Sequence, residues 1–161
     1  MTRFEHSVVI QRPLADVWAY VMEPANNAVW QGPIIEVHYP AGKPLELGSE
    51  IPEVVSFLGK RFTLTLVVTE HEPSTRSAVR TTSGPVRLDG SYRLEAVDEG
   101  STRFTNEGDV EAHGFFRVAE PVFARMARRE WASSRATLRT SWRPRPLPKR
   151  RNDARTARAQ H

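Results

Sequence analysis

The sequence of 161 residues contains no cysteine, which excludes a disulfide framework, a thiolate metal site and a cysteine nucleophile. Long apolar runs are also missing, because the longest, from Val17 to Met22, is far shorter than the roughly 20 residues that span a bilayer. The N-terminus lacks the apolar core of a signal peptide. The length suits one domain with a sizeable hydrophobic core. We therefore expect a soluble, cytoplasmic, single-domain protein without membrane insertion.

Several patterns that carry chemistry are absent as well. There is no glycine-rich phosphate loop, no dinucleotide-binding fingerprint and no nucleophile with an adjacent base. Among the five histidines, His113 has a close acidic neighbour on the same strand face, Glu111, and we assign that face to solvent. A metal site requires several converging ligands. The sequence therefore predicts no metal and no cofactor.

Positive charge is concentrated at the C-terminal end. Residues 143–161 hold seven Lys and Arg against one acid, a net charge of +6, whereas the other 142 residues hold sixteen bases and eighteen acids, a net charge of −2. Three prolines open this segment, and no apolar periodicity follows them. We predict a folded domain over residues 1–142 and a disordered basic tail over 143–161. Clustered arginines can contact nucleic acid, but without interleaved aromatic residues we favour a solvated extension.

The beginning of the chain predicts one strand and two short helices. Residues 3–11 alternate between apolar and polar side chains, as in a strand with one buried face. Apolar side chains then recur at helical spacing over residues 14–21, between Pro13 and Pro24. A second helical turn is expected over 26–29, before Gly32 and Pro33 interrupt the chain.

The middle of the chain has a period of two residues and predicts six further strands. Their expected ranges are 34–39, 49–57, 61–72, 77–83, 86–97 and 102–112. Pro52 cannot donate a ladder hydrogen bond, so we expect an edge or a bulge in the second of them. Short turns and one polar face per strand indicate an antiparallel meander. After Gly114 the helical period returns, which predicts a long helix from Phe115 to about Ser141 that lays its apolar side against the sheet.

This order of elements and several local motifs resemble the START-like (SRPBCC) superfamily, in its polyketide cyclase/dehydrase and lipid-transport branch. The resembling stretches are residues 8–10 with Arg12-Pro13 and Val17-Trp18, then Trp30, 57–62, 83–85, 90–92, 100–103 and the start of the last helix. The resemblance implies an α+β helix-grip fold, in which a curved antiparallel seven-stranded sheet wraps around the long C-terminal helix. It also implies a hydrophobic cavity between the sheet and that helix.

Candidate cavity residues follow from the strand and helix faces. The apolar candidates and one tyrosine are Phe62, Leu64, Tyr92, Leu94, Phe104, Val122, Phe123 and Met126. Asn106 and Gly108 share a face with Phe104, where they would widen the cavity and add a polar group. A β-bulge at Gly108 is the alternative explanation.

Two titratable side chains are candidates for polar anchors or for weak acid–base catalysts. Glu130 falls in the middle of the apolar arc of the last helix, where burial would raise its pKa. A bend of that helix, leaving Glu130 paired with an arginine, would give it a purely structural role. His6 shares the apolar face of the first strand, where it is either a hydrogen-bonded core histidine or a ligand contact.

The leading hypothesis is a carrier or binder of a small hydrophobic molecule, lipid-like or polyketide-like. The first alternative is a polyketide cyclase or dehydratase in which Glu130 or His6 transfers protons. The second is an interaction module whose tail contacts nucleic acid or a protein. The sequence defines neither the ligand nor the oligomeric state.

Overall fold

The computed structural model of the chain describes residues 1–57 and 59–112. The elements follow the expected order: β1 (Thr2–Ile10), α1 (Leu14–Val21), the 3-10 helix η1 (Pro24–Asn26), α2 (Asn27–Trp30), β2 (Ile34–Val37), β3 (Glu50–Phe57), β4 (Lys60–Glu72), β5 (Arg76–Ser83), β6 (Val86–Asp98) and β7 (Ser101–Ala112). The long helix expected from Phe115 to about Ser141 and the basic tail lie outside the described residues.

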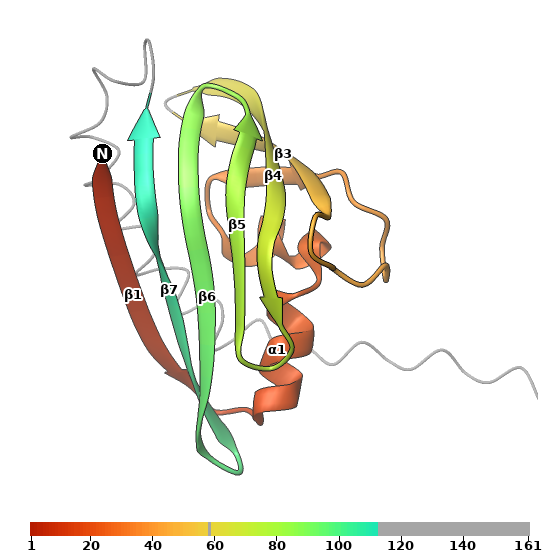
Figure 1. Cartoon of the computed structure of the whole chain (residues 1–161), viewed down its shortest axis with the longest axis vertical. Helices are drawn as coiled ribbons and strands as arrows, with labels where there is room; N and C mark the ends of the chain where they lie inside the picture. The colour runs from red at the N-terminus through yellow and green to blue at the C-terminus, as the bar shows by residue number, and fades with distance from the viewer. Residues whose placement is uncertain (58, 113–161) are drawn as a thin grey trace, which may run out of the picture.

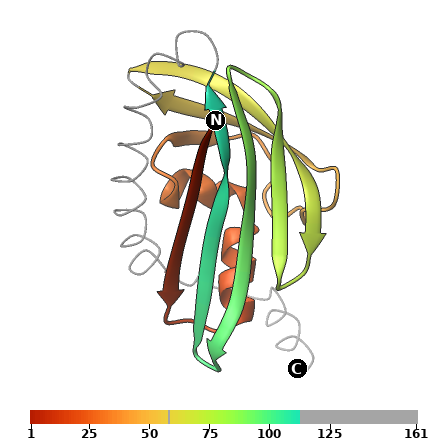
Figure 2. The ribbon, with the colours of Figure 1, turned by 60° about the vertical axis from the view of Figure 1, so that its left-hand side comes forward.

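The strands form one antiparallel seven-stranded sheet in the order β1-β7-β6-β5-β4-β3-β2. The five strands from β3 to β7 follow each other through short connections, and β1 forms the other edge of the sheet beside β7. The sheet is strongly curved, and α1 lies across one of its faces (Figures 1 and 2). This arrangement is the sheet of a helix-grip fold with its short helices, as predicted.

Pro52 lies at a local edge of β3, in line with the prediction. β3 runs as a continuous ladder against β4 from Glu50 to Phe57, with Pro52 opposite Thr65, but the ladder between β3 and β2 stops at Glu53. The proline thereby ends β2. The His38 N–H donates to the Pro52 carbonyl at 2.8 Å, but Pro52 has no N–H to return, so pairing stops one residue earlier, at Val37. This explains why β2 is two residues shorter than the predicted 34–39.

Gly108 is not the site of a β-bulge. The register between β6 and β7 is regular from Val86 to Ala96 and shifts only at its end, between Ala96 and Asp98. Gly108 lies directly opposite Gly90 on β6 and opposite Phe4 on β1. A Cβ atom at Gly108 would lie 2.4 Å from the Asp89 carbonyl oxygen and 3.0 Å from the Phe4 ring. The glycine therefore permits a close approach of two backbones and makes room for that ring.

The main core lies between α1, α2 and parts of β1, β6 and β7. It contains Ile10, Val17, Val21, Trp30, Leu94 and Phe104. Trp30, which is 1% exposed, packs edge-on against Phe104 and Tyr92, with ring centroids 5.7 and 5.8 Å away. Within the described ranges, no helix is long and apolar enough to cross a membrane.

Candidate ligand-binding cavity

A cavity of about 160 Å³ lies on the inner face of the sheet. All seven strands contribute to its lining, together with the end of α1 and the segment from Pro24 to Pro33. Most of the lining is aliphatic, with Ile51, Val55, Leu64, Leu66 and Leu88 among the contributors. Apolar cavities with a few polar groups are typical of small-molecule sites.

Strand β3 places a carboxyl group in this apolar wall. Its residues alternate strictly, so that Ile51, Glu53, Val55 and Phe57 face inward and are buried. Glu53 is only 2% exposed. Burial raises the pKa of Glu53 to about 7, and the hydrogen bond from Asn27 opposes part of this rise. The cavity therefore contains a carboxyl group that takes up and releases a proton near neutral pH.

The short helix α2 supplies two amide side chains. Asn27 and Gln31 are four residues apart, at the start and just beyond the end of α2, so their side chains project on the same side. Asn27 Nδ2 donates to Glu53 Oε1 at 2.9 Å. Gln31 Nε2 donates to the Tyr92 hydroxyl oxygen, also at 2.9 Å. All four side chains line the cavity.

Tyr92 presents a protonated hydroxyl to the cavity. Burial and the nearby Glu53 carboxylate both raise its pKa, and the Gln31 hydrogen bond opposes this rise. Because the hydroxyl oxygen accepts from Gln31, its own proton is free to point elsewhere. Asn106 lies opposite Tyr92 in the register, is 4% exposed and also lines the cavity. The polar groups thus gather on one part of an otherwise apolar wall.

The structure brings three of the predicted site residues together at the cavity, namely Leu64, Tyr92 and Asn106. Leu94 and Phe104 are buried in the closed core with Trp30 and are not among the cavity-lining residues. Phe62 is half-buried beside the cluster of Ile34, Val55, Leu64 and Val86. His6 is half-buried, with its ring 6.2 Å from that of Phe4, and is not among the cavity-lining residues. Val122, Phe123, Met126 and Glu130 lie outside the described residues.

The sequence interpretation missed Glu53, Asn27 and Gln31. A signal for Glu53 was available, because it occupies an inward position in the alternation of residues 51–57. The edge or bulge expected at Pro52 obscured that alternation. Asn27 and Gln31 had no comparable signal, since a helix of four residues is too short to show a periodicity.

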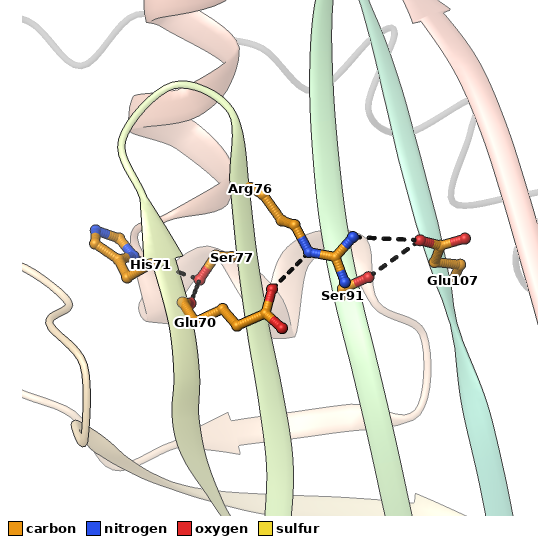
Figure 3. Close-up of polar contacts among 6 residues, drawn as sticks. All are labelled: Glu70, His71, Arg76, Ser77, Ser91 and Glu107. Carbon is orange, nitrogen blue, oxygen red and sulfur yellow. Dashed lines mark hydrogen bonds and ion pairs between the residues drawn. The ribbon is translucent and has the colours of Figure 1, made fainter.

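The opposite face of the sheet carries a second polar group, shown in Figure 3. The Arg76 guanidinium lies between two carboxylates, 2.7 Å from Glu70 and 3.8 Å from Glu107. Ser91 Oγ donates to Glu107 at 3.4 Å. These side chains border a shallow hollow of about 260 Å³. One guanidinium thus lies beside two carboxylates and neutralises one of the two negative charges.

No group of three or more His, Asp or Glu side chains within residues 1–57 and 59–112 is arranged to hold a metal ion. The polar side chains of the described residues that line the cavity are a carboxyl, a phenol, a serine hydroxyl and three amides.

Residues 1–140 match the family described as polyketide cyclase/dehydrase and lipid transport, and the chain belongs to that family. None of the curated proteins compared with the sequence matches it.

Solved structures agree with this fold at low sequence identity. Zhui, an aromatase/cyclase from Streptomyces sp. R1128, is 17% identical over 85% of this chain and 90% of its own, with a TM-score of 0.68. A START superfamily protein from Mycobacterium smegmatis is 13% identical over 83% of this chain and 97% of its own, with a TM-score of 0.61. The di-domain ARO/CYC BexL from the BE-7585A biosynthetic pathway is 20% identical, with a TM-score of 0.62. The match covers 86% of this chain and 45% of BexL. These likenesses show the fold alone.

Proposed function

We propose that the chain binds a small hydrophobic molecule that carries a polar group. The observation that supports this most directly is the apolar cavity of about 160 Å³ with Glu53, Tyr92 and the amides on one side. An engineered cavity of about 150 Å³ lined by apolar side chains accepts benzene in another protein. The size therefore suits one ring or a short acyl segment of a ligand. The family description, which includes lipid transport, is consistent with this.

In this proposal the apolar wall holds the body of the ligand, and Glu53, Asn27, Tyr92 and Asn106 hold its polar end. Phe62, Glu130 and the other predicted residues of the last helix remain candidates for further contacts. A purely apolar wall would bind any compound of suitable size, whereas buried polar groups discriminate against ligands that leave them unpaired.

Binding can be tested on the full-length chain by native mass spectrometry of the freshly purified protein, compared with its denatured mass. A mass excess released on denaturation is expected from an endogenous ligand. Toluene then serves as a defined probe, added in sealed tubes during a titration followed by ¹H–¹⁵N NMR. We expect saturable shifts at Ile51, Leu66 and Leu88.

A pair of matched substitutions links binding to the cavity. Val79→Phe places a larger side chain in the lining and is expected to weaken toluene binding at least tenfold. Val97→Phe makes the same change at an exposed position on β6, which is 49% exposed, and is expected to leave binding unchanged. The absence of both a mass excess and a saturable toluene shift would contradict the proposed function.

A second candidate function is proton-transfer catalysis of the cyclase or dehydratase type, and the position of Glu53 favours it. A buried carboxyl with a pKa of about 7 is suited to act as a general base and acid near neutral pH. Its carboxylate would take a proton from the carbon next to a ketone, and the Tyr92 hydroxyl would hydrogen-bond the ketone oxygen as negative charge develops there. Zhui and BexL are aromatase/cyclases by name, which is consistent with this candidate.

The catalytic candidate makes a prediction that does not depend on the natural substrate. α-Tetralone incubated with the protein in D₂O should exchange its α-protons for deuterium faster than in buffer, because Glu53 removes a proton and the enolate takes a deuteron from solvent. Glu53→Gln should reduce the rate to that of buffer, while Glu70→Gln, at an exposed position, should not. Equal rates with parent protein and with buffer would argue for binding without catalysis.

A further inference from the structure

The cavity contains hydrogen-bond acceptors that are not satisfied by the chain around them. Asn27 is 7% exposed, and its Oδ1 atom has no hydrogen-bond partner among the residues that the structure describes. Glu53 accepts one hydrogen bond, from the other end of the same Asn27 amide group. A carboxylate has room for several donors. A buried, unsatisfied acceptor costs free energy. A ligand that donates a hydrogen bond to this acceptor removes that cost and is bound more tightly.

Negative charge at Glu53 is also uncompensated by the residues that the structure describes. Of the described residues that line the cavity, none is Lys, Arg or His. Burial raises the pKa of Glu53 and the Asn27 hydrogen bond lowers it, and no cation of the described ranges contributes. This contrasts with Glu70 and Asp89 on the outer face, which lie 2.7 Å from Arg76 and Arg80. Among residues 1–57 and 59–112, the inner site therefore contains no positive charge.

The unsatisfied acceptors and the lack of a cation among the described lining residues together define a ligand class. A hydroxyl group has a single proton to donate, so it can satisfy either Asn27 Oδ1 or Glu53. A protonated amine has two or three donor hydrogens and a positive charge, and it can satisfy both acceptors while neutralising the carboxylate. Asn27 Oδ1 and Glu53 Oε1 belong to groups joined by a 2.9 Å hydrogen bond, so one ammonium group can reach both.

We propose that the cavity prefers a hydrophobic primary or secondary amine, bound in its protonated form between the Glu53 carboxylate and Asn27 Oδ1. Its apolar body lies against the aliphatic wall that includes Ile51, Val55 and Leu66. This inference rests on the proposed binding function and specifies the ligand for it. It makes Glu53 the residue that determines specificity, and the wall the part that accepts apolar bodies in general.

Three probes of similar size and different polarity test the inference: toluene, benzyl alcohol and benzylamine. Each is titrated into the full-length chain at pH 8 and at pH 6, followed by ¹H–¹⁵N NMR. At pH 8 we expect benzylamine to bind at least tenfold more tightly than benzyl alcohol. Between pH 8 and pH 6 the ionised fraction of a carboxyl with a pKa of about 7 falls about tenfold, while an alkylamine stays protonated. The affinity for benzylamine should fall by a similar factor, and that for toluene should not.

Glu53→Gln and Glu70→Gln provide the matched variants. The first keeps the shape of the cavity and should abolish both the preference for benzylamine and its pH dependence, while toluene still binds. The second removes an exposed carboxylate of the outer face and should change nothing. The amine preference is overturned if benzylamine binds no more tightly than benzyl alcohol to the parent chain, or if Glu53→Gln retains the preference. In both cases continued toluene binding leaves the binding function intact, whereas failure of all three probes together with the absence of a mass excess overturns the binding function itself.

Discussion

The outer face of the sheet pairs its acidic side chains with arginines, whereas the inner face holds Glu53 without one. Glu70 and Asp89 lie 2.7 Å from Arg76 and Arg80 at exposed positions, where an ion pair adds little stability and costs little. Glu53 is buried, and its only partner in the described part of the chain is an amide. The fold can pair carboxylates, so the isolation of Glu53 is not a general property of the sheet. Strongly shifted titratable groups in cavities concentrate at functional sites.

The largest expected difference between the two faces concerns stability against pH. Folding raises the pKa of Glu53 from 4.5 to about 7, so between these values the folded chain keeps a proton that the unfolded chain has released. Stability therefore falls as the pH rises from 4.5 to 7 and stays at the lower level above it. At about 1.4 kcal/mol per pH unit, the loss reaches about 3 kcal/mol.

Glu53→Gln removes that loss. We expect this variant to be up to about 3 kcal/mol more stable than the parent chain at pH 8 and equally stable at pH 4. Glu70→Gln on the outer face should have the opposite sign and cost only about 0.5 kcal/mol at pH 8. Urea denaturation followed by circular dichroism measures both. A destabilising effect of Glu53→Gln at pH 8 would mean that the carboxylate has a compensating partner.

A somewhat smaller loss of stability is expected from a substitution at Gly108, where the backbones of β6 and β7 lie close together. Gly108→Ala places a Cβ atom 2.4 Å from the Asp89 carbonyl oxygen and 2.9 Å from Gly90 Cα. Backbone atoms must shift, and we expect a loss of about 2–3 kcal/mol. The same change at Gly100 meets only the Asp98 side chain, at 3.8 Å, and should stay within about 0.5 kcal/mol. Thermal denaturation distinguishes the two, and equal effects would indicate that β6 and β7 lie further apart.

The smallest effect separates the Asn27–Glu53 hydrogen bond from the general burial of Glu53. Asn27→Ala removes a donor that favours the charged carboxylate, so the pKa of Glu53 should rise further. We expect the variant to lose about 1 kcal/mol more at pH 8 than at pH 5. Asn26→Ala, which removes a hydrogen bond to the Tyr20 carbonyl, should show no such difference. An NMR titration of the Glu53 carboxyl carbon checks the shift, and an unchanged pKa would assign the whole shift to burial.

The strands could be predicted from the sequence because one buried face gives a period of two. β4 was expected over 61–72 and spans Lys60–Glu72. β2 was expected over 34–39, and its length could not be predicted because Pro52 on the neighbouring strand limits it. Alternation within one strand carries no information about its partner.

The candidate site was less predictable for a related reason. Leu94 and Tyr92 share the inner face of β6, yet Leu94 lies in the closed core and Tyr92 at the cavity. The alternation of side chains gives the face of the sheet on which a residue lies. It does not say which part of a strand of 13 residues borders the cavity and which part packs in the core with Trp30. The cavity also depends on Asn27 and Gln31, whose four-residue helix has too few turns to produce a pattern.

Gly90 lines both the inner cavity and the outer hollow, so at this residue a single backbone separates them. Its amide resonance consequently responds to the aromatic rings and polar groups of the cavity and to the charged side chains of the outer hollow. An experimenter could follow ligand entry on one side and salt-dependent rearrangement of the arginines on the other through one signal. The glycine is thus a built-in spectroscopic reporter that requires no label beyond nitrogen-15.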